Sequence, residues 1–197
     1  MTAAPGRRGR RPAGEDTRGL IAVAARAEFA DKGYEAASLR AIARAAGVDA
    51  ALVHHYYAGK AALFAEVVVQ APVDPVRLVD GILAGPREGL GERLVRGFLG
   101  LWDEPANQER FVALATAALT NDQVAALMRS FLATEVLGRI TRETGIADPE
   151  LRGGLAATQI LGLAVVRYGI RFPSVATATP DDIARWLGPV LQRYLVD

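Results

Sequence analysis

The sequence contains no cysteine among its 197 residues, so disulfide bonds and thiolate metal sites are excluded, as suits a reducing compartment. Only two histidines and two lysines occur. The histidines are neighbours, His54 and His55, and adjacent side chains on a helix point about 100° apart. No third imidazole exists to complete a metal site with them. We therefore expect neither a metal nor a cofactor.

Signal-peptide features and catalytic signatures are also missing. The first residues carry arginines that no apolar core follows, and no later run approaches the length that crosses a membrane. The signatures G-x-S-x-G, G-x-x-x-x-G-K-S/T and H-E-x-x-H do not occur. We expect a cytoplasmic protein that is not an enzyme and makes no membrane contact. A carboxylate pair in a helical cleft is the one catalytic arrangement that the sequence leaves open.

The net charge is only +1, but the charges are unevenly distributed. Residues 1–70 carry ten Lys/Arg against seven Asp/Glu, whereas residues 71–197 carry thirteen against fifteen. Arg7, Arg8, Arg10 and Arg11 supply most of the surplus, in a Gly- and Pro-containing segment that has no apolar residues to pack. We expect residues 1–15 to be a flexible basic arm that neutralises phosphates or enters a minor groove. A solvated tail is the alternative.

Two short helical patterns meet at a glycine turn in the segment SLRAIARAAGVDAALVHHYYAGK, which runs from Ser38 to Lys60. Ser38 can cap the first helix, Gly47 can end it in the left-handed conformation, and Asp49 can cap a second helix almost at once. Helices joined this tightly cross steeply and present the second one to a DNA major groove. The segment therefore predicts a helix-turn-helix that reads DNA.

The residues of this segment are expected to divide between core and DNA. Tyr57 is the ring that should turn inward, with its hydroxyl near the surface. The positions expected to contact bases or phosphates are Ser38, Arg40, Asp49, Ala50, Ala51, His54, His55, Tyr56 and Lys60. The Lys60 ammonium and the free N–H groups of the helix that Lys60 begins should converge on one phosphate. Alternatively, His54 or His55 only covers the surface of the lobe.

Helical periodicity covers the rest of the chain, and no segment predicts a strand. Besides the two motif helices and a fourth helix beyond Gly59, the expected helices span residues 16–32, 76–83, 88–102, 105–119, 122–143, 148–172 and 180–195, the first capped by Asp16. We expect an all-α fold of about nine helices. Its amino-terminal three-helix lobe should cover residues 16–70, and a larger helical lobe should cover residues 71–197.

Many residues of the first lobe together resemble the amino-terminal domain of the tetracycline-repressor (TetR) family of one-component regulators. They are Thr17, Arg18, Phe29, Gly33, Tyr34, Ser38, Leu39, Ile42, Ala43, Ala46, Gly47, Val48, Tyr57 and the segment from Lys60 to Leu63. Four residues depart from those common in the family: Ala51 stands for glycine, His54 for tyrosine, Tyr56 for histidine and Tyr57 for phenylalanine. The later segments resemble an actinobacterial subgroup of the family.

The resemblance implies an all-α homodimer in which each protomer has a DNA-binding lobe and a larger lobe that binds a small molecule. The last two long helices of the larger lobe would form the dimer. Members of the family usually repress transcription and release a palindromic operator when their ligand binds. The alternatives are a DNA-binding regulator that does not respond to a small molecule, and an activator.

Aromatic, sulfur-containing and polar side chains of the second lobe are candidates for the effector site, because ligand pockets are mostly apolar with a few orienting polar groups. These candidates are Phe98, Trp102, Phe111, Met128, Phe131, Gln159, Arg167 and Tyr168. The same spacing describes an ordinary core, which is the alternative for each residue. Because the sequence has no distinctive charged cluster, it favours an apolar or amphipathic effector.

The helix expected over residues 148–172 is apolar or small over most of its surface, so it must be buried on more than one side. With the last helix it could form a four-helix interface across a twofold axis. The residues expected at this interface are Leu155, Gly162, Gly169, Leu187, Leu191 and Tyr194. Burial within the same chain is the alternative.

Overall fold

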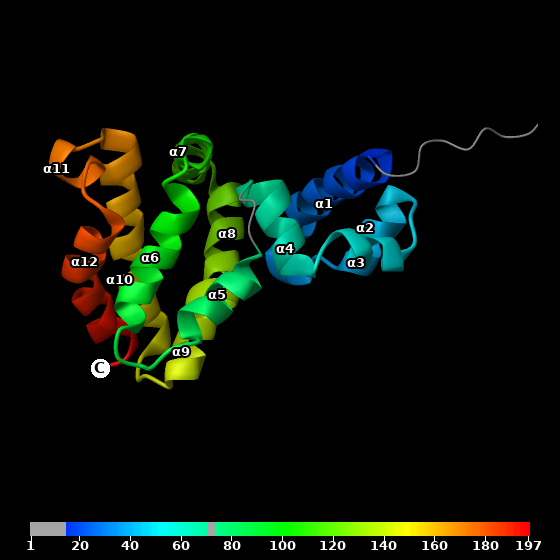
Figure 1. The fold of residues 1–197 in the computed structure, drawn as a ribbon. Coiled ribbons are helices and arrows are strands. Elements are labelled where there is room, and N and C mark those ends of the chain that lie inside the picture. Colours follow the sequence, from blue (N-terminus) through cyan, green and yellow to red (C-terminus); the bar gives the residue numbers. More distant parts are fainter. Residues whose placement is uncertain (1–14, 71–73) are drawn as a thin grey trace, which may run out of the picture.

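The computed structural model describes residues 15–70 and 74–197, which contain eleven continuous helices and no strand (Figure 1). The amino-terminal lobe contains α1 (Glu15–Ala36), α2 (Leu39–Ala46), α3 (Ala50–Tyr56) and α4 (Lys60–Phe64), which the π segment η1 (Ala65–Val69) extends. The second lobe contains α5 (Pro75–Leu83), α6 (Leu90–Trp102), α7 (Pro105–Thr120), α8 (Asp122–Phe131) continued by η2 (Leu132–Val136) and α9 (Leu137–Thr144), α10 (Pro149–Ala164) continued by η3 (Val165–Ile170), α11 (Pro173–Ala176) and α12 (Pro180–Leu195). The predicted all-α fold is confirmed.

Side-chain caps explain where the two motif helices begin. The Ser38 hydroxyl accepts a hydrogen bond from the backbone N–H of Ala41 at 3.2 Å, which caps α2. Gly47 ends α2 with φ 68°, a left-handed conformation that glycine adopts without strain. The Asp49 carboxylate accepts from the N–H of Ala51 at 2.7 Å and caps α3. The predicted helix-turn-helix is therefore present, with the predicted caps.

Helix α1 differs from its prediction at its start. It begins at Glu15, so Asp16 lies inside the helix rather than at its cap. Gly33 has φ 77° and ψ 174°, a non-helical conformation, so the helical geometry is interrupted directly after Lys32, where the stop was predicted. A further helical turn beyond this kink reaches Ala36.

The three π segments and the short helix α11 were not predicted. A π turn shifts the helix by one residue, and hydrophobic spacing alone does not reveal such a shift. Helix α11 is a single turn that begins at Pro173, a residue whose constrained φ suits the first helical position. Of these elements only α11 adds a helix, because each π segment continues a helix that was predicted.

The two lobes share an aromatic core. Phe29, Tyr34 and Phe64 of the first lobe pack with Phe131 of α8, and all four are buried. The ring centroids of Phe64 and Phe131 lie 4.8 Å apart, and those of Tyr34 and Phe131 lie 5.5 Å apart. A movement of α8 would therefore displace α1 and α4, because their rings pack directly on Phe131.

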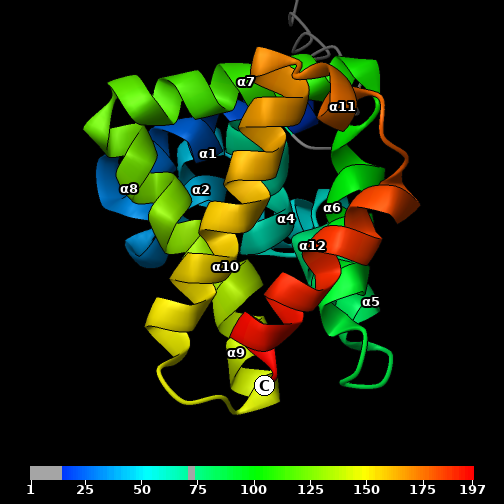
Figure 2. The same cartoon turned by 90° about the vertical axis from the view of Figure 1, so that its left-hand side faces the viewer.

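Helices α10 and α12 lie side by side on one outer face of the second lobe (Figure 2). On its inner side, α12 packs on α6 so closely that the two backbones touch at Gly91 and Gly188. A Cβ atom on Gly91 would lie only 2.1 Å from the carbonyl oxygen of Gly188. This crossing, which only glycine permits, sets the position of α12 in the lobe.

Among residues 15–70 and 74–197, one helix is long and apolar enough to cross a membrane, contrary to the expectation that no run approaches that length. It consists of α10 and η3 and spans 22 residues, of which little is buried inside the chain. Helix α7 and the α8–α9 helix reach that length and hydropathy only when they are taken together, and they are bent by 117° relative to each other. Because α10 is covered on one side only, its outer side is suited to a further partner.

Candidate nucleic-acid interface and effector cavity

Helix α3 divides sharply into an inner and an outer side. Val53 and the following Tyr57 are buried, whereas Ala51, His54 and His55 are exposed. Arg40 is likewise exposed, in the first turn of α2, and Ala50 is half-buried against the core. The outer side of α3 and the start of α2 are thus accessible to a duplex, as the sequence indicated. The contacts of these residues with DNA stay a prediction.

Ser38 and Asp49 are exposed, but their side-chain oxygens accept the capping hydrogen bonds of α2 and α3. Their role in this structure is to cap the two helices of the motif, which fixes where the reading helix α3 begins. For a contact with DNA, Ser38 still has its hydroxyl hydrogen to donate, and Asp49 has the second oxygen of its carboxylate to accept with.

Tyr57 and Tyr56 have different surroundings. Tyr57 is 3% exposed, so its predicted place in the core is confirmed, and its hydroxyl lies 3.5 Å from a carboxylate oxygen of Glu66. Burial raises the pKa of Tyr57 above the ordinary tyrosine value, although the Arg18 guanidinium opposes this. Tyr56 is half-buried, and its ring packs at 5.1 Å against His55. Tyr56 is thus held at the edge of the lobe.

Lys60 does not have the free ammonium that was expected to meet a phosphate. Its Nζ donates to the carbonyl oxygens of Tyr34 at 2.9 Å and Glu35 at 3.1 Å, and it lies 4.6 Å from the centre of the Tyr34 ring. A cation is stabilised by the carbonyls at the carboxyl end of a helix. Lys60 therefore joins the start of α4 to the end of α1, and its contact with a phosphate stays a prediction.

The predicted basic arm, with Arg7, Arg8, Arg10 and Arg11, lies outside the described residues. Its contact with DNA stays a prediction.

An apolar cavity of about 230 Å³ lies in the second lobe, between η1 and helices α5 to α10. Five of the eight predicted effector residues line it: Phe98, Trp102, Phe111, Met128 and Phe131. Prediction from sequence missed the aliphatic part of the wall, in particular Leu101, Leu114, Leu132 and Ile160. Leu101 and Leu114 each follow a predicted aromatic residue by three positions, a spacing that could have revealed them.

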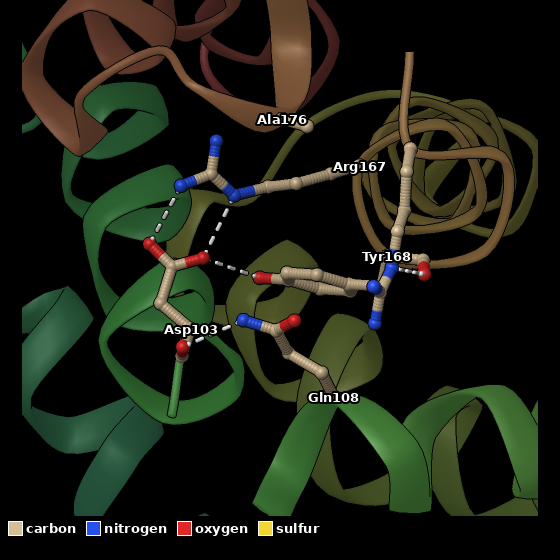
Figure 3. A pocket seen from close by; sticks show the side chains of 6 residues that line it. Asp103, Gln108, Arg167, Tyr168 and Ala176 are labelled. Carbon is tan, nitrogen blue, oxygen red and sulfur yellow. Dashed lines mark hydrogen bonds and ion pairs between the residues drawn. The ribbon is translucent and has the colours of Figure 1, made fainter. Parts of the chain in front are cut away.

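The three polar candidates are not among the residues that line the apolar cavity, contrary to the prediction that they orient a ligand there. Gln159 is half-buried, and its amide donates to the Thr158 hydroxyl at 3.4 Å. Arg167 and Tyr168 line a second, polar hollow of about 370 Å³ (Figure 3). The helical turn at η3 directs these two side chains toward the end of α6 instead of into the apolar cavity.

Asp103 organises the polar hollow. The Arg167 guanidinium donates to both carboxylate oxygens, from Nε at 2.7 Å and from a terminal nitrogen at 3.0 Å, and the Tyr168 hydroxyl donates to one of them at 3.0 Å. Burial raises the pKa of Tyr168 well above the ordinary tyrosine value, and the negative charge of Asp103 adds to this. Tyr168 therefore stays protonated and acts as a hydrogen-bond donor. In Figure 3 the Arg167 guanidinium and the Tyr168 hydroxyl converge on the Asp103 carboxylate.

The outer face of α10 and α12 leaves large apolar side chains uncovered in the single chain. They are Leu151, Leu155, Val165, Trp186 and Val190, and we call this set the outer apolar face. Gly162 and Gly169 are exposed on α10 and η3, and Leu187 and Tyr194 are half-buried on α12. Such a face fits a contact with a second copy of the chain.

Leu191 was expected at the same interface, but it is fully buried inside its own chain. It follows Gly188 by three residues and Ala184 by seven, both of which are also buried. The helical phase therefore turns Leu191 inward, toward the side of α12 that packs on α6. It is not available to a partner.

Two family models match the chain. The model described as "Bacterial regulatory proteins, tetR family" matches residues 21–67, and the model described as "Tetracyclin repressor-like, C-terminal domain" matches residues 88–195. The chain belongs to the TetR family. It is therefore a helix-turn-helix transcriptional regulator that binds DNA, and the regulators of this family dimerise and carry a carboxyl-terminal ligand-binding domain.

Similar proteins include other regulators of this type. The HTH-type transcriptional regulator UidR of Escherichia coli is 25% identical over 179 residues, which cover 87% of this chain and 86% of UidR. The HTH-type transcriptional activator FasR of Mycolicibacterium smegmatis is 29% identical over 154 residues, which cover 71% of this chain and 66% of FasR. The crystal structure of a TetR-family regulator from Streptomyces coelicolor is 34% identical, with 96% and 99% of the two chains covered and a TM-score of 0.47.

Proposed function

We propose that this TetR-family protein is a homodimeric repressor that releases a palindromic operator when a small apolar or amphipathic effector enters the second lobe. It works in the cytoplasm and catalyses no reaction. Residues 1–15 form a DNA-binding arm, residues 16–70 read the operator, and residues 71–197 bind the effector and form the dimer. The observation that supports effector release most strongly is the position of η2, which belongs to the cavity wall and also contacts α1.

The two sides of η2 face different partners. Leu132 and Val136, four residues apart, line the apolar cavity. Between them, Glu135 accepts a 2.6 Å hydrogen bond from the hydroxyl of Tyr34, near the end of α1. Burial of that hydroxyl, with the carboxylates of Glu135 and Glu35 adding to the effect, raises the pKa of Tyr34 far above its ordinary value, so it stays a donor.

Further contacts join α1 to η2, through Thr134, and to the preceding helix α8, through Ser130 and Gln123. The carboxylate of Glu35 accepts hydrogen bonds from the hydroxyl of Thr134 and, at 3.4 Å, from that of Ser130. The Gln123 amide donates to the carbonyl oxygen of Ala30. A ligand that displaces the η2 wall of the cavity would therefore move α1, and with it the reading helix.

In a dimer, such a movement would change the distance between the two reading helices. The two reading helices of a helix-turn-helix dimer must enter major grooves about 34–36 Å apart. A ligand that binds more tightly to a dimer with another spacing favours that conformation. It can lower the affinity for the operator by at most the ratio of its own affinities for the two conformations.

The direct test uses an aliphatic probe with an operator recovered by selection from random duplexes. 1-Octanol is expected to stabilise the protein against heat by occupying the cavity, and to weaken operator binding in fluorescence anisotropy. If octanol occupies the cavity, as shown by the thermal shift, and leaves operator affinity unchanged, the protein is a regulator without small-molecule response. A promoter-reporter assay then separates repression from activation, the function named for FasR.

Replacing Tyr34 with phenylalanine is expected to reduce the effect of octanol on operator affinity severalfold, because the variant loses the hydrogen bond that couples α1 to η2. Operator affinity without octanol should change less, and stability should fall by about 1–2 kcal/mol. The matched control is Tyr57→Phe, which removes a hydroxyl within the first lobe alone. Equal effects of octanol on both variants would contradict coupling through Tyr34.

A further inference from the structure

The polar hollow and the apolar cavity lie back to back. Three rings separate them: Trp102 and Phe111 line the cavity, and Tyr168 lines the hollow. The ring centroids of Trp102 and Phe111 are 5.2 Å apart, and those of Phe111 and Tyr168 are 5.9 Å apart. Asp103 directly follows Trp102 on α6, and Gln108 precedes Phe111 by one turn on α7. The two spaces are therefore one ring layer apart.

Within the hollow, the ion pair of Asp103 and Arg167 is already satisfied. The remaining terminal nitrogen of Arg167 donates to the carbonyl oxygens of Val175 at 2.6 Å and Ala178 at 3.0 Å. Its side chain is only 9% exposed. The pair therefore forms a neutral, rigid wall that also holds the chain segment around α11 in place.

Arg171 has a different environment. It lines the same hollow, is exposed, and donates only from Nε, to the carbonyl oxygen of Tyr168 at 3.4 Å. No carboxylate in the described part of the chain forms an ion pair with it. Its backbone has φ 56°, a left-handed conformation that costs a non-glycine residue roughly 1 kcal/mol or more. The hollow therefore holds one uncompensated guanidinium on a strained backbone.

We propose that the polar hollow and the apolar cavity together form a bipartite site for an amphipathic carboxylate. The carboxylate head binds the Arg171 guanidinium, which offers the charge-assisted hydrogen bonds that carboxylates favour. The Phe111 ring turns aside, and the aliphatic chain enters the cavity beyond it. At roughly 30 Å³ for a water-sized group, about 230 Å³ holds about seven or eight such groups. The chain is therefore of medium length. This inference rests on the proposed function and specifies its effector.

Octanoate and 1-octanol carry the same chain and differ in the head group, so their affinities test the proposal. Isothermal titration calorimetry at neutral pH should show that the native protein binds octanoate about tenfold more tightly than octanol, as one charged hydrogen bond provides. Arg171→Gln should abolish this preference and leave octanol binding unchanged. The matched control is Arg129→Gln, which removes an exposed arginine from α8 and should keep the preference.

A second variant places negative charge in the hollow without touching Arg171. Ala176→Glu should weaken octanoate binding at least tenfold and leave octanol binding unchanged, because like charges repel. Equal binding of octanoate and octanol by the native protein, no octanoate binding, or a preference that survives Arg171→Gln would overturn the bipartite site.

Operator release distinguishes this inference from the proposed function. If octanol releases the operator while octanoate shows no preference that depends on Arg171, the carboxylate site is wrong and the ligand-released repressor stands. If octanoate binds through Arg171 without releasing the operator, the site is right and ligand-controlled repression is wrong.

Discussion

Gly162→Arg is expected to produce a folded monomer that binds the operator at least about a hundredfold more weakly than the native dimer. Gly162 is exposed on α10, and nothing lies within 4 Å of where its Cβ would be, so the single chain has room for an arginine. The outer apolar face surrounds it, with Leu155 and Val165 close by on α10 and η3. A second copy on this face would bury two like charges near a twofold axis, which costs several kcal/mol.

Size-exclusion chromatography with light scattering measures the mass, and fluorescence anisotropy measures operator binding. The matched control is Gly81→Arg on α5, where the Cβ position is equally open and the residue lies away from the outer apolar face. It should remain a dimer with native operator affinity. A Gly162→Arg variant that stays dimeric at micromolar concentration would place the interface elsewhere.

Gly91→Ala is expected to destabilise the protein by about 3 kcal/mol or more, because the added methyl group has no space. Its Cβ would lie 2.1 Å from the carbonyl oxygen of Gly188 and 2.6 Å from the backbone nitrogen of Gln192. Both atoms belong to the backbone of α12, so no side-chain rotation relieves the clash and the helices must separate. Overpacking of this kind commonly costs 1–3 kcal/mol, and backbone displacement adds to it.

Urea unfolding followed by circular dichroism measures this change, at one protomer concentration because dimerisation contributes to stability. Gly100→Ala is the matched control in the same helix α6, since nothing lies within 4 Å of its Cβ position. It should be neutral or stabilise the protein by up to about 1 kcal/mol, because alanine favours helix more than glycine does. Equal midpoints for the two variants would contradict the close crossing of α6 and α12.

Features determined by neighbouring residues could be predicted from the sequence. The caps by Ser38 and Asp49 and the left-handed Gly47 depend on side chains within a few positions of the helix ends, so the helix-turn-helix was predicted correctly. The inward position of Tyr57 followed from the periodicity of one short helix. The aromatic residues of the cavity were found in the same way, because apolar spacing marks the inner side of each helix.

Features that depend on contacts between distant segments could not be predicted. The ammonium of Lys60 is held by carbonyls at the end of α1, about 25 residues earlier in the chain. Arg167 is directed by Asp103, 64 positions before it, into a polar hollow that no local pattern reveals. Leu191 is turned inward by the glycine crossing of α6 and α12. In each case tertiary packing decides the direction of a side chain whose residue type suits either environment.

The central claim is that the protein is a dimeric, sequence-specific DNA-binding regulator. The most direct test is selection of random duplexes on the purified full-length protein, followed by sequencing and by affinity measurements at several salt concentrations. The selected duplexes should share a palindrome whose half-sites lie about one helical turn apart or a multiple of it, and each mismatched base pair should cost about 1–3 kcal/mol. Salt-dependent binding without any enriched sequence would show phosphate contact alone and would contradict the claim.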